Sequence, residues 1–70
     1  MKLALDSNRY TDLCRGDTEL QVLLEQAEQI FLPFVVVAEL RAGFATGRRA
    51  AQNEAVLQRF LLKPQVAVLH

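Results

Sequence analysis

The chain has 70 residues, 51% of them apolar, with eight basic and eight acidic side chains and a formal net charge of zero. This length allows one small domain. One cysteine and one histidine exclude an internal disulfide and a structural zinc site, which needs about four such ligands. The apolar fraction is too high for a disordered tail. Without a disulfide or a bound metal, so small a core rarely supplies more than about 3–5 kcal/mol of folding free energy. We therefore expect a partner subunit or a longer parent chain.

The sequence predicts neither a membrane span nor a secretion signal. No apolar run reaches the length of about 18 residues that a span requires. Met1 leads directly into the first expected strand, without a signal peptide. A reducing cytoplasm is the expected compartment, and the lone thiol of Cys14 agrees with it.

The charges are unevenly divided along the chain. Residues 1–40 hold seven acids and three bases, whereas residues 41–70 hold five bases and one acid. The positive excess of the second part permits contact with a polyanion. Two complementary halves of one fold would show the same pattern, so both interpretations stay open.

Hydrophobic periodicity predicts the order β-αα-β-αα-β. Such alternation is typical of the α/β class, with a parallel sheet and right-handed crossovers. Because parallel sheets are normally covered on both faces, we expect more chain than these residues. The expected strands are residues 2–5, 30–32 and 65–69, and the expected helices are residues 8–13, 18–29, 33–45 and 50–62.

Short polar residues and a proline mark the helix starts. Asp6 or Ser7 caps the first helix, and Thr18 begins a capping box for the second. Pro33 suits the first turn of the third helix, where its missing N–H is not needed. The valines that follow are poor helix formers, so burial must override propensity there. A longer strand reaching Val37 is the alternative.

Asp6 is the first candidate for chemistry. It follows a buried strand, at the carboxyl end where α/β sheets place their functional groups. From the local sequence it is equally a metal ligand or a helix cap. Asn8, on the same turn, is able to hold the carboxylate in place. A nucleotide-binding loop is excluded, because no glycine follows the strand.

Glu39 is the second candidate. It lies in the most apolar stretch of the chain, and its neighbours one helical turn away carry no positive charge. A carboxylate in such surroundings is costly unless a bound metal, an arginine from another segment or water meets it. Asp6 and Glu39 share one cleft if the first two strands pair, since neighbouring strands lie about 4.8 Å apart. One or two carboxylates, with waters and substrate phosphates, are a common Mg²⁺ site.

Two motifs together resemble PIN-domain ribonucleases of the VapC toxin type. The first is Leu5-Asp6-Ser7-Asn8, which closes the first strand. The second runs from Leu32 to Gly43 and has the spacing Pro-x₅-Glu-Leu-x-x-Gly. The resemblance extends over all 70 residues, including the turn at Arg48 and Arg49, and corresponds to the amino-terminal half of a single PIN domain.

The resemblance implies a PIN-like α/β/α sandwich that binds Mg²⁺ or Mn²⁺ and cleaves RNA. It implies that Asp6 and Glu39 are catalytic, metal-binding acids and that Asn8 supports Asp6. The family needs one or two further aspartates after the third strand, which this chain does not contain. Weak or no cleavage is therefore expected of these residues alone.

The resemblance also implies partners. These are the RNA substrate, a cognate VapB-like antitoxin and frequently a second copy of the toxin. A hypothesis from another class is a non-catalytic fragment with an unpaired sheet edge, which binds an antitoxin or self-associates. Solvated surface is the alternative for each of the candidate contacts to RNA or antitoxin, which are Arg9, Arg41, Arg48 and Arg49.

Overall fold

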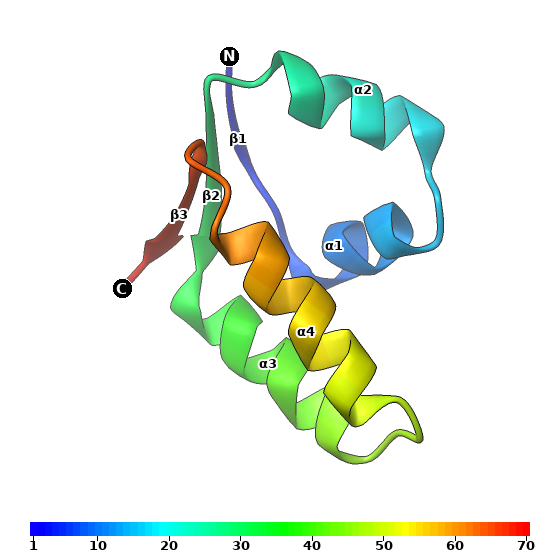
Figure 1. Cartoon of the computed structure of the whole chain (residues 1–70). Helices are drawn as coiled ribbons and strands as arrows, with labels where there is room; N and C mark the ends of the chain where they lie inside the picture. The colour runs from blue at the N-terminus through cyan, green and yellow to red at the C-terminus, as the bar shows by residue number, and fades with distance from the viewer.

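The computed structural model describes all 70 residues and confirms the expected order of elements (Figure 1). Three strands alternate with two pairs of helices. No helix has the length and apolarity needed to cross a membrane. The elements are β1 (Lys2–Ala4), α1 (Ser7–Cys14), α2 (Thr18–Gln26), β2 (Gln29–Pro33), α3 (Phe34–Ala45), α4 (Ala50–Leu61) and β3 (Val66–Leu69).

Aspartates cap the first two helices. Asp6 Oδ1 accepts a hydrogen bond of 2.8 Å from the Arg9 N–H, so Asp6 and not Ser7 caps α1. Asp17 Oδ1 accepts one of 3.0 Å from the Leu20 N–H at the start of α2. The expected capping box at Thr18 is therefore wrong by one residue. An Asp carboxylate suits a helix start because it also meets the positive end of the helix dipole.

The helix α3 begins directly after Pro33, and the alternative of a strand to Val37 is wrong. Val36, Val37 and Leu40 are buried on one side of α3, whereas Val35 is exposed. Burial of this stripe overrides the low helix propensity of the valines.

The sheet is parallel, with the strand order β1-β2-β3. Because successive strands lie side by side in one direction, right-handed crossovers bring both helix pairs to the same face. Figure 1 shows all four helices on one side of the sheet. The α/β class and the parallel sheet are confirmed. The chain itself forms two layers, so the third layer of the expected α/β/α sandwich is not made by these residues.

One core joins the sheet to the helices. Ile30 and Leu32 of β2 and Leu57 of α4 are its most completely buried large side chains. Tyr10 of α1 meets Phe60 of α4 edge to face, with ring centroids 5.5 Å apart. The core thus fixes α1 against α4 and places the starts of α1 and α3 at the same edge of the sheet.

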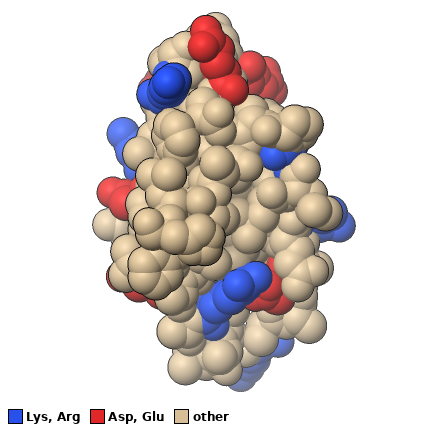
Figure 2. Space-filling model, turned by 90° about the vertical axis from the view of Figure 1, so that its left-hand side faces the viewer, with Lys and Arg blue, Asp and Glu red and all other residues tan.

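The opposite face of the sheet carries no helix, and we call it the open face. Side chains alternate along a strand, and Ile30 and Leu32 point into the core, so their neighbours point outward. Figure 2 views this side and shows a broad uncharged surface, with charged residues at its upper and side margins and a basic beside an acidic side chain in its lower part. By the strand register, the open face consists of Lys2, Ala4, Gln29, Phe31, Pro33, Ala67 and Leu69.

Candidate functional site

Asp6 lies at the carboxyl edge of the sheet, as expected. Its preceding residue, Leu5, donates a backbone hydrogen bond of 3.0 Å to the Phe31 oxygen, so Asp6 stands beside the end of β2. The side chain is exposed and forms no ion pair. One carboxylate oxygen caps α1, and the second has no hydrogen-bond donor within the chain. Asp6 can therefore cap α1 with one carboxylate oxygen and bind a metal ion with the other.

Glu39 is the sixth residue of α3 and lies about 8 Å along the helix axis from its start. It is exposed and has neither an ion pair nor a side-chain hydrogen bond. Its carboxylate is thus exposed to solvent and meets no arginine of another segment. Residues two apart on a helix point about 200° away from each other, so Glu39 and Arg41 lie on different flanks of α3.

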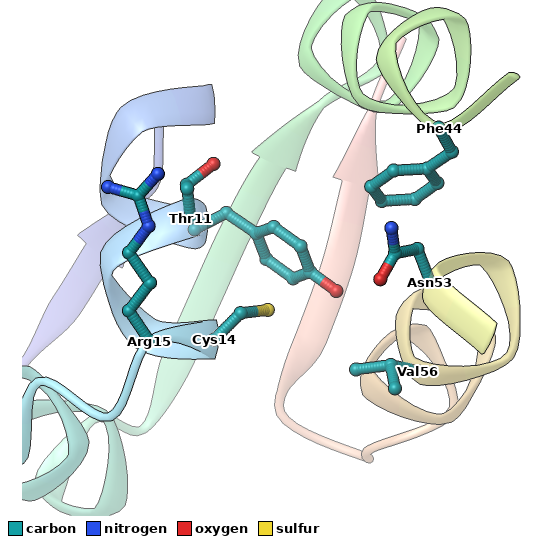
Figure 3. Close-up of a pocket in the computed structure, with 7 residues that line it drawn as sticks. Thr11, Cys14, Arg15, Phe44, Asn53 and Val56 are labelled. Atoms are coloured by element: carbon teal, nitrogen blue, oxygen red, sulfur yellow. The ribbon is translucent and has the colours of Figure 1, made fainter. Parts of the chain in front are cut away.

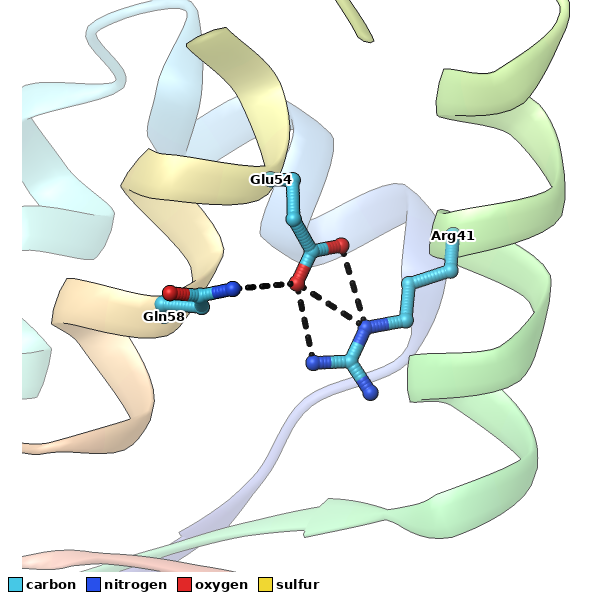
Figure 4. A network of polar contacts seen from close by, with 3 residues as sticks. All are labelled: Arg41, Glu54 and Gln58. Atoms are coloured by element: carbon cyan, nitrogen blue, oxygen red, sulfur yellow. Dashed lines mark hydrogen bonds and ion pairs between the residues drawn. The ribbon is translucent and has the colours of Figure 1, made fainter. Parts of the chain in front are cut away.

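Arg41 is held on its flank by Glu54 of α4 (Figure 4). Arg41 Nη2 lies 2.9 Å from Glu54 Oε2, and Arg41 Nε lies 3.0 Å from Oε1. Gln58 Nε2 donates to the same carboxylate at 3.2 Å. The hydrogen bonds from Arg41 and then Gln58 lower the pKa of Glu54, and the bond to Glu54 raises the pKa of Arg41. Arg41 is thus engaged in joining two helices.

Glu54 was not among the residues predicted from the sequence. A signal for it existed, because Glu54 is the single acid among residues 41–70. The ion pairs of the structure are Arg41–Glu54 and the amino terminus with Glu28 at 3.5 Å. Neither joins residues 1–40 to residues 41–70, so the charge division does not reflect pairing between two halves.

The other predicted polar residues are exposed and separate. Asn8 makes no side-chain hydrogen bond to Asp6, whose bonding partner is the Arg9 N–H. Arg9 lies in the first turn of α1, close to Asp6, and forms no ion pair. Arg48 and Arg49 lie in the turn between α3 and α4, also without ion pairs. These three arginines leave their positive charge free at the surface.

The Tyr10 hydroxyl lies beside a cavity of about 240 Å³ between α1, α3 and α4 (Figure 3). The hydroxyl is buried without a hydrogen-bond partner. Burial raises the pKa of Tyr10 well above its ordinary value, and the nearby Cys14 adds to the rise, so the hydroxyl stays protonated. The thiol of Cys14 itself is exposed. The other residues lining the cavity are Thr11, Arg15, Phe44, Asn53 and Val56.

Asp6 and Glu39 supply the oxygen ligands that a hard divalent cation prefers, but they are only two ligands. No group of three or more His, Cys, Asp or Glu gathers in the chain, and neither Asp6 nor Glu39 lines a cavity. Both are exposed carboxylates without a cationic partner, Asp6 at the carboxyl edge of the sheet and Glu39 in the second turn of α3. That donor set suits an ion that keeps several waters, as Mg²⁺ does.

Comparison with known proteins finds a likeness of fold. No family model matches the chain, and no curated protein matches it. A solved structure, the crystal structure of VapBC2 from Rickettsia felis bound to a DNA fragment from their promoter, contains a similar chain. The TM-score is 0.70 and the identity is 24% over 99% of this chain and 54% of that chain. The present chain thus spans about half the length of its structural neighbour.

This result corrects the family assignment that the motifs implied. A likeness at 24% identity to a chain of a VapBC2 complex, without a matching family model, does not make the chain a PIN-domain ribonuclease of the VapC type. Asp6 caps α1 and Pro33 directly precedes α3, so both motifs also have a structural role as helix starts. The comparisons therefore show a small α/β fold, with a three-stranded parallel sheet and four helices, that is shared with a chain of that complex.

Proposed function

We propose that the chain supplies two ligands of a Mg²⁺ or Mn²⁺ site in an endoribonuclease. The observation that carries this proposal is that the Glu39 carboxylate has no cationic partner. The nearby arginine on the same helix, Arg41, is paired with Glu54. Asp6, at the carboxyl edge of the sheet, has one oxygen free. A bound cation favours the charged form of the carboxylates beside it, so two exposed acids without cationic partners are suited to hold one.

The exposed charged residues have separate roles in the proposal. Asp6 and Glu39 hold the ion, and Asp6 also keeps the start of α1 in place. The bound ion would supply Lewis acidity and an activated water for phosphodiester cleavage. Arg9, close to Asp6, and Arg48 and Arg49, in the turn at the far end of α3, attract the RNA backbone through free positive charge. An open edge without a deep cavity suits a polymer substrate.

Metal binding tests the proposal separately from catalysis. The chain is titrated with Mn²⁺, and bound ion is followed by electron paramagnetic resonance. Asp6→Asn and Glu39→Gln should each weaken binding at least tenfold, and Glu25→Gln, an exposed acid of α2, should leave it unchanged. Asn caps a helix as well as Asp does, so the first variant keeps its fold. Equal Mn²⁺ affinity in all four proteins would refute the site.

Cleavage is the second readout. Mg²⁺-dependent cutting of structured RNA is measured with the chain and with any longer protein that contains it. Two carboxylates hold the ion weakly, so the 70-residue chain should cut slowly or not at all. In a longer active protein, both substitutions should remove cleavage. Undiminished cutting in both variants would contradict the roles of Asp6 and Glu39.

The open face favours a second candidate function, which is protein binding without catalysis. Phe31, Pro33 and Leu69 leave an apolar surface on a parallel sheet, and such sheets are normally covered on both faces. The structural neighbour is a chain of a toxin–antitoxin complex, so an antitoxin-type protein is the candidate partner. Phe31→Lys should abolish co-purification with such a protein encoded beside the gene. Val22→Lys, at an exposed apolar position of α2, should not. If both variants still co-purify with that protein, the open face is excluded as its binding surface.

A further inference from the structure

We propose that β3 pairs with β3 of a second copy of this chain, antiparallel about a two-fold axis at Val68, to form a continuous six-stranded sheet. β3 is an edge strand of the sheet, with β2 on one side only. Pairing through β3 is independent of the metal site, because Asp6 and Glu39 follow β1 and β2 and neither lies in β3.

The two edges of the sheet differ in how they are protected. At the β1 edge, Lys2 carries a charge and the amino terminus pairs with Glu28. At the β3 edge, residues 65–69 read Gln-Val-Ala-Val-Leu and contain no charge, no proline and no glycine. Edge strands that stay unpaired usually carry such protection. The β3 edge therefore has the composition of a strand that pairs.

Several backbone N–H and C=O groups of β3 point away from β2 and have no hydrogen-bond partner. The Gln65 oxygen accepts from the Ile30 N–H at 2.7 Å, so Gln65 and every second residue after it face β2. Val66 and Val68 therefore direct their backbone groups outward. The Val66 N–H is already satisfied by the Lys63 oxygen at 3.0 Å. The outward groups without a partner are the Val66 oxygen, both groups of Val68 and the His70 N–H.

This set of groups is complementary to itself in one register. When Val68 faces its own copy in a hydrogen-bonded pair, the two residues exchange both N–H···O bonds. The His70 N–H then meets the Val66 oxygen of the partner subunit, and the symmetric bond forms as well. In the register shifted by one pair, Val66 faces Val68, and the Val68 oxygen then meets the Val66 N–H that already donates to the Lys63 oxygen. His70 would face Pro64 in that register, and Pro64 has no N–H. Val68 is thus the favoured centre.

The surroundings of β3 support a second copy as the occupant. Phe34, Leu62 and Leu69 are exposed apolar residues at or next to β3 or the carboxyl end of β2. Val68 and His70 also line a groove of about 440 Å³ with Phe34, whose ring stacks on His70. The two-fold axis brings two such grooves together. The chain has zero net charge, so two copies do not repel each other as like-charged bodies.

The assembly is tested by sedimentation equilibrium of the 70-residue chain. The expected mass is twice the 7.9 kDa of one chain. Val68→Pro removes an outward N–H and no bond to β2, and should return the mass to that of one chain. The matched control is Ala4→Pro, which removes an outward N–H from the opposite edge and should stay dimeric. A monomeric native chain, or a Val68→Pro variant that remains dimeric, would overturn the proposal.

Disulfide trapping checks the register with a substitution that keeps every backbone N–H of β3. In a Cys14→Ala background, Val68→Cys places two thiols on directly opposed residues, about 5.5 Å apart at Cα, within disulfide reach. In the control Leu69→Cys, the two cysteines are diagonal neighbours at about 7–8 Å and should cross-link at least tenfold more slowly. Equal cross-linking at both positions, or faster trapping at Leu69, would refute the Val68 axis.

Discussion

Tyr10 of α1 and Phe60 of α4 meet edge to face with their ring centroids 5.5 Å apart, while the Tyr10 hydroxyl is buried without a partner. The ring therefore contributes packing, and the hydroxyl contributes a cost. An unsatisfied buried hydroxyl costs about 1–3 kcal/mol. The contact joins helices from the two halves of the chain, so its energetics bear on the whole fold.

Tyr10→Phe should leave the free energy of unfolding unchanged or raise it by about 1 kcal/mol, because it removes the unpaired hydroxyl and keeps the ring. Tyr10→Ala should lower it by about 3–5 kcal/mol through the loss of the ring. Urea denaturation followed by circular dichroism measures both. A loss of more than about 1 kcal/mol in Tyr10→Phe would show that the hydroxyl has a partner in solution.

The order of elements could be predicted from the sequence because apolar periodicity and helix-start residues are local. Pro33 and the buried Val36, Val37 and Leu40 stripe set α3 in this way. The sandwich could not be verified from the same pattern. Which strand lies beside which is a long-range property, and the order β1-β2-β3 is what leaves one face open.

The candidate site was predictable only in part, for a similar reason. The positions of Asp6 and Glu39 follow from the ends of β1 and β2. The partner of Arg41 lies 13 residues away on α4, and only the packing of α3 against α4 brings it near. Asn8 shows the converse, because closeness in sequence to Asp6 does not produce a hydrogen bond.

Removal of the Arg41–Glu54 ion pair should make the free energy of unfolding depend less on pH in the acid range. The pKa of Glu54 is lowered in the folded chain, so its contribution is present above its unfolded pKa and is lost as the pH falls through the folded pKa. Glu54→Gln should therefore be less stable than the native chain at neutral pH and approach it in acid. Both side chains are part-exposed, so added salt should shrink the difference.

Thermal unfolding from neutral to acid pH, at low and high salt, measures this effect. Glu25→Gln is the control, since Glu25 forms no ion pair. A difference between native chain and Glu54→Gln that persists unchanged in acid would contradict the contribution of the ion pair.

Asp17→Ala should lower the free energy of unfolding by about 1 kcal/mol, the typical value of a lost helix cap. The reason is the 3.0 Å bond from the Leu20 N–H to Asp17 Oδ1. Asp17→Asn should retain most of this stability, because Asn accepts the same bond. Thr18→Ala should change little, since Thr18 lies inside α2. Chemical denaturation compares the three variants. A larger loss of unfolding free energy for Thr18→Ala than for Asp17→Ala would show that Thr18 caps α2 after all.

Leu32→Ala should unfold most of the chain at 25 °C. Leu32 is completely buried in the central strand β2, and a Leu-to-Ala change at such a site costs about 2–5 kcal/mol. A core of this size supplies about 3–5 kcal/mol in total, so the loss approaches the whole stability. Leu62→Ala is the matched control, because Leu62 is 82% exposed and its truncation should change stability by less than about 0.5 kcal/mol. Circular dichroism and amide exchange distinguish the outcomes. A cooperative unfolding transition retained by Leu32→Ala would mean that association through β3 or the open face supplies stability beyond that of the single chain.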